Sequence, residues 1–342
     1  MYRLASDFRF KPILCAVAAV PAHGAPGLGR HQHASRLTAG RTWLAAVLLA
    51  WCCIPTAGAA PSTAAAMLQT KAQQLAQPLA NNIFQRPVVL ESTEASSELR
   101  GTIYAVVNHP FSDLRQALQS PGNWCEILML HINTKYCAVQ TGRGNSESLL
   151  AVRVGRKIDQ PLEDAQEVVF GYRVQASEAD YMDVRLSADE GPLSTKDYRI
   201  GLRATPLESG KSFIQLDYSY SYGAAARLAM QGYLATLGRG KVGFTPAGNG
   251  NIGGVRGVVE RNTMRYYLGI DVFLNSLKTP LAQQRDKRLT EWFDATEQYA
   301  KQLHEIDRND YLAMKRREFE RLATGTAAAT TKAATTAAPS TN

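Results

Sequence analysis

A long apolar helix that follows a series of alternating segments most limits what this chain can fold into. The helix is predicted over residues 258–277, where apolar side chains occupy nearly all sides, and Pro280 ends it. A helix of this kind is buried on more than one side. We therefore expect one side to face a sheet and another to be covered by residues 281–306, whose apolar side chains recur at helical spacing.

The segments before this helix alternate between apolar and polar residues with a period of two, which indicates strands with one buried face. Seven strands are predicted, over residues 99–107, 134–140, 149–154, 168–174, 182–186, 198–204 and 214–222. Two short helices, 111–118 and 123–130, separate the first strand from the second, and Pro110 precedes the first helix. One wet face and one buried face favour an antiparallel sheet. The predicted fold class is therefore α+β, with about seven strands.

The composition of the remaining sequence predicts where the domain begins and which segments it contains. Residues 60–85 are rich in Ala and Gln and are predicted to be a linker or helix that leads into a domain over 86–280. Within the domain, a helix is expected over 222–237 and a glycine-rich loop over 238–257. This loop contains a literal G-x-G-x-x-G at 248–253, but no βαβ unit surrounds it, so dinucleotide binding is not predicted.

The chain after the domain separates into two parts. Residues 281–323 are predicted to form a helical extension, whose last segment, 310–322, is expected to be a charged and frayed helix. Residues 324–342 consist largely of Ala and Thr and are predicted to be disordered.

The first 59 residues are predicted to be a leader segment. Arg41 precedes an apolar run at 43–54, and Pro55 and the small residues 57–59 follow. A basic flank, an apolar run of this length and a small-residue site are typical of a secretory signal peptide, and the run is shorter than a membrane span. We therefore predict an exported, periplasmic bacterial protein, with a retained anchor or a chance apolar stretch as the alternatives.

Charge and histidine placement limit the classes of function. Residues 1–59 contribute +5 of the net charge of +8, so the remainder lacks the basic stripe that nucleic-acid binding requires. The histidines of the mature part, His109, His131 and His304, lie far apart in sequence, as structural histidines often do. We predict no nucleic-acid partner, no metal site and no cofactor.

Two cysteines remain after the leader, Cys125 and Cys137. Two cysteines this close in an exported chain are compatible with a disulfide. The alternative is a pair of buried free thiols. No C-x-x-C redox motif or metal-ligand spacing is present in the mature part.

The order of elements resembles the START-like superfamily, also called helix-grip or SRPBCC, and in particular a group of bacterial START-like proteins. The segments that carry the resemblance are 104–111 (YAVVNHPF), 123–128 (NWCEIL), 191–198 (GPLSTKDY) and 260–267 (ERNTMRYY). The similarity covers about residues 88–278. It implies a curved antiparallel sheet around a C-terminal helix, with a cavity between them that binds lipids, sterols, polyketides or other hydrophobic molecules.

Residues on the facing sides of the last two strands and the long helix are predicted to line this cavity. They are Tyr198, Leu202, Leu216, Tyr218, Tyr220 and Tyr222 from the strands and Arg261, Met264, Arg265, Tyr267, Leu268 and Asp271 from the helix. Tyrosines suit an amphiphilic ligand because each has an apolar ring and a polar tip. The alternative is a filled core with the hydroxyls at its rim.

Arg261 and Arg265 lie four residues apart and share one helix face, so they can clasp a carboxylate or phosphate group. The alternative is that Glu260 pairs with an arginine on the surface, or that an acidic residue of the sheet buries one of the two arginines.

Three functions remain open. The first is non-catalytic binding or transport of a hydrophobic or amphiphilic molecule, with transient membrane contact. The second is a cyclase- or aromatase-like enzyme, which the resemblance also allows and which would use Glu260 or Asp271 with a tyrosine or His109 as an acid–base pair. The third is an interaction module in which residues 281–322 bind a partner protein.

Overall fold

The structure is a computed structural model that describes residues 62–142, 148–224, 227–228, 231–232 and 240–336. The leader predicted over residues 1–59 and most of the helix predicted over 222–237 lie outside these residues. Among the described residues, no helix is both long enough and apolar enough to cross a membrane.

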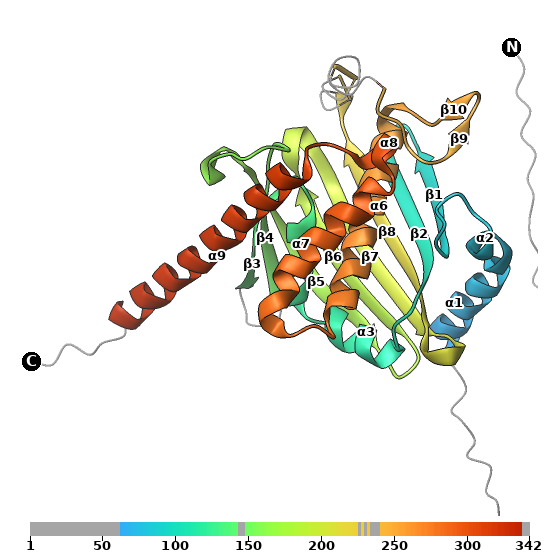
Figure 1. Cartoon of the computed structure of the whole chain (residues 1–342), viewed down its shortest axis with the longest axis horizontal. Coiled ribbons are helices and arrows are strands. Elements are labelled where there is room, and N and C mark those ends of the chain that lie inside the picture. The colour runs from blue at the N-terminus through green and yellow to red at the C-terminus, as the bar shows by residue number, and fades with distance from the viewer. Residues whose placement is uncertain (1–61, 143–147, 225–226, 229–230, 233–239, 337–342) are drawn as a thin grey trace, which may run out of the picture. The chain divides into compact units, whose positions relative to one another are not determined.

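Eight strands form one antiparallel sheet with the order β1-β2-β8-β7-β6-β5-β4-β3 (Figure 1). Their bounds are β1 Val88–Glu94, β2 Glu98–Val107, β3 Thr134–Thr141, β4 Ser148–Val154, β5 Gln166–Ser177, β6 Met182–Glu190, β7 Thr195–Pro206 and β8 Ser212–Tyr222. The two short helices α3, Phe111–Leu118, and α4, Pro121–Leu130, carry the chain from β2 to β3 at the far edge of the sheet. The predicted fold class is confirmed, with eight strands in place of about seven.

The additional strand is β1, at the edge of the sheet next to β2. Its sequence begins with the apolar run Val88, Val89 and Leu90 and continues with four polar residues, so it has no period of two. Only its pairing with β2, in which Val88 lies opposite Ala105, makes it a strand. The alternation criterion therefore missed it.

Helix α6, Gly254–Ser276, lies across the inner face of the sheet and contacts β1, β2 and β8 (Figure 1). It begins four residues before the predicted start. Its buried residues include Met264 and Leu268 on one side and Phe273 on the opposite side. The long apolar helix therefore has the central position that its composition predicts.

The outer face of the sheet is partly covered. Helix α1, Thr63–Gln74, begins at Ser62, whose hydroxyl accepts a hydrogen bond from the Ala65 backbone N–H at 3.2 Å. Its apolar side, with Leu68, packs in one cluster with the stacked rings of Tyr104 and Phe213. A short helix α2, Ala76–Ala80, follows. The segment predicted as a linker or helix over 60–85 thus contributes a second, smaller core on the face of the sheet that we expected to be exposed to solvent.

As far as Thr336, where the described residues end, the chain after α6 forms three helices, α7 Leu281–Glu297, α8 Ala300–Leu303 and α9 Arg308–Thr336. Helix α7 packs on α6, and the indole N–H of Trp292 donates to the Arg265 carbonyl at 3.3 Å. The single segment expected over 281–306 is broken between α7 and α8. Helix α9 continues to Thr336, into the tail that we expected to be disordered.

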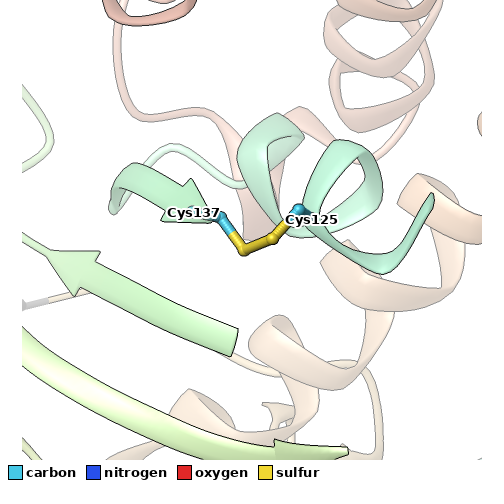
Figure 2. Close-up of a disulfide and its surroundings, with 2 residues drawn as sticks. All are labelled: Cys125 and Cys137. Carbon is cyan, nitrogen blue, oxygen red and sulfur yellow. A yellow bond between two sulfur atoms is a disulfide. The ribbon is translucent and has the colours of Figure 1, made fainter. Parts of the chain in front are cut away.

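A disulfide joins Cys125 of α4 to Cys137 of β3, so the paired alternative is confirmed (Figure 2). The Cα atoms are 5.3 Å apart and the two residues are separated by 12 positions. Both side chains belong to the inner core. The bond ties the short helix to the strand that follows it.

Removal of this disulfide in Cys125→Ala/Cys137→Ala is expected to lower the free energy of unfolding by about 3 kcal/mol, because a loop of this length gains chain entropy in the unfolded state. Chemical denaturation of the variant and of the wild type, each with and without reductant, measures the loss. The wild type should lose stability in reductant and the variant should not. Equal stability of all four samples would contradict a stabilising disulfide.

Candidate ligand-binding site

Four tyrosines pack together between the sheet and α6, and we call them the tyrosine cluster: Tyr198, Tyr218, Tyr220 and Tyr266. Tyr198 of β7 stacks on Tyr220 of β8 with ring centroids 5.3 Å apart. Tyr218 of β8 lies 5.6 Å from Tyr220 and 5.2 Å from Tyr266 of α6. The cluster therefore joins β7 and β8 to helix α6.

Local structure explains how the cluster forms. Tyr218 and Tyr220 are two residues apart on β8 and so share the inner face of the sheet. The register between β7 and β8 shifts between Lys196 and Arg199. Tyr198 lies within this irregularity, where it reaches the ring of Tyr220.

The tyrosine hydroxyls remain neutral. Burial raises the pKa of Tyr218 well above its usual value, and a hydrogen bond from Asn262 opposes this only in part. Burial also raises the pKa of Tyr198, Tyr220 and Tyr266. The cluster thus presents polar but uncharged groups.

Part of the tyrosine cluster is accessible to solvent. Tyr218 and Tyr220 are each only 4% exposed, whereas Tyr198, Tyr266 and Asn262 are partly exposed. Asn262 and Tyr266 are one helical turn apart on α6, on the side where Tyr266 contacts Tyr218. An accessible surface of aromatic rings and one amide therefore lies on the side of α6 that faces the sheet.

His131 borders the same region from the end of α4. Its ring stacks on Tyr266 at 5.2 Å, and its Nδ1 accepts a hydrogen bond from the Asn133 backbone N–H at 3.2 Å. Burial, with help from Arg265, lowers the pKa of His131 well below 6.5, so the ring is neutral and Nε2 carries the proton. Among the described residues this buried Nε2 makes no well-formed hydrogen bond, although Asn262 interacts with it.

The predicted site residues separate into three sets. Tyr198, Tyr218 and Tyr220 lie together in the tyrosine cluster, and Tyr222 is buried at the end of β8. The four apolar residues without aromatic rings are fully buried and belong to the same hydrophobic core as the tyrosines: Leu202, Leu216, Met264 and Leu268.

The remaining predicted residues, all on α6, have other neighbours. Asp271 pairs with Arg86 at 3.0 Å, and Tyr267 lies beside that pair, on a different face of α6 from Tyr266. Arg261 donates to the Val242 carbonyl at 3.2 Å and lies near Tyr220. The structure therefore does not bring Tyr267 and Asp271 into the tyrosine cluster.

Arg265 has an acidic partner within the chain. Its Nη2 lies 2.7 Å from Glu305, which follows α8, and its Nη1 donates to the Asn262 side-chain oxygen at 3.4 Å. Arg265 is therefore paired with an acidic residue of the chain, but this residue lies in the C-terminal extension and is neither Glu260 nor an acid of the sheet.

Glu260 is a structural carboxylate. It is fully buried, and its Oε1 accepts hydrogen bonds from Ser92 at 2.5 Å and from the Thr245 hydroxyl at 2.6 Å. Its Oε2 accepts the backbone N–H groups of Phe244 at 2.5 Å and Thr245 at 2.9 Å. Three of these bonds fasten the residues just before a small hairpin, β9 Pro246–Ala247 and β10 Gly250–Asn251, to α6, and the bond from Ser92 joins α6 to β1.

The groups that were candidates for acid–base catalysis are thus engaged in other contacts. Glu260 holds the hairpin, Asp271 pairs with Arg86, and His109 interacts through Nε2 with the Asn275 side-chain oxygen at 3.1 Å. The literal glycine motif at 248–253 lies in the hairpin and the residues after it. Within the described part of the chain, no group of three His, Cys, Asp or Glu residues could hold a metal ion.

Sequence reasoning missed Tyr266 and Asn262. Tyr266 and Tyr267 are adjacent, so they differ by about 100° around the helix, and apolar composition on nearly all sides gave no reason to prefer one. The spacing of Asn262 and Tyr266, four residues apart, was the available signal, because residues at this spacing share a face.

A surface pocket of about 330 Å³ lies away from the tyrosine cluster. Its aromatic wall consists of Phe84, Phe244 and Tyr299, whose rings contact one another at 5.5–6.1 Å. A much smaller void of about 10 Å³ lies between α6 and the C-terminal helices, next to Arg265 and Trp292.

No family model and no curated protein matches this sequence. Among solved structures, human StAR-related lipid transfer protein 5 is similar at 11% identity and a TM-score of 0.32, over 62% of this chain and 96% of that chain. A conserved protein from Geobacillus kaustophilus is similar at 11% identity and a TM-score of 0.33, over 52% and 95%. Truncated norcoclaurine synthase from Thalictrum flavum is similar at 14% identity and a TM-score of 0.30, over 43% and 91%.

The strand order and the position of α6 across the inner face are those of the helix-grip arrangement that the START-like resemblance implies. The assignment of fold rests on this topology.

Proposed function

We propose that this chain binds a hydrophobic or amphiphilic small molecule at the tyrosine cluster without chemical conversion. The observation that carries the proposal is the partly exposed aromatic surface of Tyr198 and Tyr266, beside the Asn262 amide, on the side of α6 that faces the sheet. Aromatic rings bind apolar groups, and a few neutral polar groups orient them. Asn262 and the tyrosine hydroxyls supply such groups.

We also propose that the protein acts in the periplasm, as a carrier of this molecule. The disulfide between Cys125 and Cys137 supports an oxidising compartment. Native mass spectrometry of mature protein from the periplasm of its host, before and after organic extraction, tests both statements. Extra mass that disappears on extraction would identify the carried molecule, and the protein mass would locate the cleavage site of the leader.

Tyr198→Asp is expected to weaken the binding of a pyrene-labelled long-chain alcohol at least tenfold, because a charge would then stand beside the ring of Tyr220. Tyr198 is partly exposed, so the variant is expected to fold. The matched control is Tyr299→Asp, a partly exposed tyrosine of the separate aromatic pocket. Equal binding by both variants, measured by fluorescence titration with circular dichroism as the check of folding, would contradict the proposal.

A further inference from the structure

Three cations converge on one carboxylate, that of Glu305. Its Oε1 lies 2.7 Å from Lys157 Nζ and 2.7 Å from Arg265 Nη2, and its Oε2 lies 3.4 Å from Lys241 Nζ. The Glu305 side chain is only 8% exposed. Burial raises the pKa of Glu305, but the three cations outweigh this and hold the pKa below its usual range.

The cations and the carboxylate come from different parts of the fold. Arg265 belongs to α6, Lys157 lies after β4, and Lys241 lies before the β9–β10 hairpin. Glu305 lies in the non-helical segment 304–307 between α8 and α9. The three cations therefore belong to the domain, whereas the carboxylate belongs to the C-terminal extension.

The backbone of the extension is held at the same place. Arg265 Nη2 donates to the Leu303 carbonyl at 3.2 Å, and Lys241 donates to the His304 carbonyl. N–H donors that converge in this way are complementary to a carboxylate, with its two oxygens and negative charge.

Arg265 connects this carboxylate to the tyrosine cluster. Its Nη1 contacts the side chain of Asn262, which lies one turn from Tyr266. On its other side, Arg265 and Glu305 line the void of about 10 Å³, together with Trp292 and Tyr311. A void of this size holds about one water molecule. An acidic group at Arg265 would thus lie at one end of the accessible aromatic surface.

We propose that Arg265, Lys157 and Lys241 form a carboxylate-binding site that Glu305 occupies as an internal ligand, and that the acidic end of a long-chain carboxylate replaces Glu305 when it binds. The replacement of Glu305 by a ligand rests on the proposed function, because the hydrocarbon part of the ligand would lie along the tyrosine cluster. The class of ligand is then an amphiphilic carboxylate, and the segment 304–307 regulates its entry.

Chemical rescue tests the carboxylate site without any long-chain ligand. Glu305→Ala should melt about 5 °C or more below the wild type, because three cations lose their shared partner. Acetate should restore at least half of this loss in a saturable manner, and chloride at the same ionic strength should not. Asp294→Ala, which removes the exposed partner of Arg308, is the control that acetate should leave unchanged. Equal effects of acetate and chloride on Glu305→Ala would overturn the site.

The exchange of Glu305 for the carboxylate of a ligand is tested with a pyrene-labelled long-chain acid and the matching alcohol. In Glu305→Gln, which keeps the shape of the side chain and removes its charge, affinity for the acid should rise about tenfold while affinity for the alcohol stays the same. An unchanged affinity for the acid, with normal binding of the alcohol, would overturn the exchange alone. If neither ligand binds the wild type or the variant, the proposed function and the exchange both fail, and acetate rescue alone decides the carboxylate site.

Discussion

Glu318→Ala is expected to lower the free energy of unfolding by about 3–5 kcal/mol and to release α9 from the sheet, because it leaves buried charges without their partner. Glu318 is fully buried, and its two oxygens lie 3.0 Å from Lys135 of β3 and 2.8 Å from Lys315 of α9. Burial lowers the pKa of both lysines, and that of Lys315 falls to about 8.

The two lysines also hold the backbone between α4 and β3. Lys315 donates to the carbonyls of His131 at 2.8 Å and Thr134 at 2.7 Å, and Lys135 donates to the Ile132 carbonyl at 3.1 Å. One carboxylate thus balances two ammonium groups that join α9 to this segment. Without Glu318, each ammonium group must lose its proton or remain buried and unbalanced.

Urea denaturation and limited proteolysis measure this prediction, the second by early cleavage of α9. Glu320→Ala is the matched control, since Glu320 is exposed on the same helix, and it should change the free energy of unfolding by less than about 0.5 kcal/mol. Equal stabilities of the two variants would show that α9 does not depend on the buried carboxylate.

Trp292→Ala is expected to lower the free energy of unfolding by about 3–5 kcal/mol, because it leaves a cavity between α6, α7 and α9. Trp292 is 3% exposed and stacks on Tyr311 of α9 with centroids 5.1 Å apart. Its indole N–H also donates to the Arg265 carbonyl of α6. A single side chain therefore connects the extension to the helix that crosses the sheet.

Leu281→Ala provides the comparison for Trp292→Ala in the same denaturation experiment. Leu281 lies at the start of α7 but is 84% exposed, so its truncation should have little effect. If the two variants lost similar amounts of stability, the packing of Trp292 between the extension and α6 would not stabilise the protein.

The sequence determined the elements that have a strong local period. Strands β2 to β8 follow from their alternation, and α6 follows from its apolar composition. Both patterns arise from neighbouring residues, which set the face that each side chain occupies. The tyrosines of β8 were placed on the inner face for the same reason, and two nearby cysteines indicated a possible disulfide that the structure contains.

Interactions between distant residues were decided by the tertiary structure. Strand β1 lacks a period and exists because β2 offers it an edge. The charged helix expected over 310–322 is not a frayed surface helix, because Lys315 and Glu318 face the segment between α4 and β3 and are fully buried there.

The same division holds at the candidate site. The sequence indicated that tyrosines and arginines face the interior from β7, β8 and α6. It did not indicate that Tyr266 joins the cluster instead of Tyr267, or that the partner of Arg265 lies 40 residues further along the chain. A local period fixes the direction of a side chain relative to its own element, whereas its partner depends on how separate elements pack.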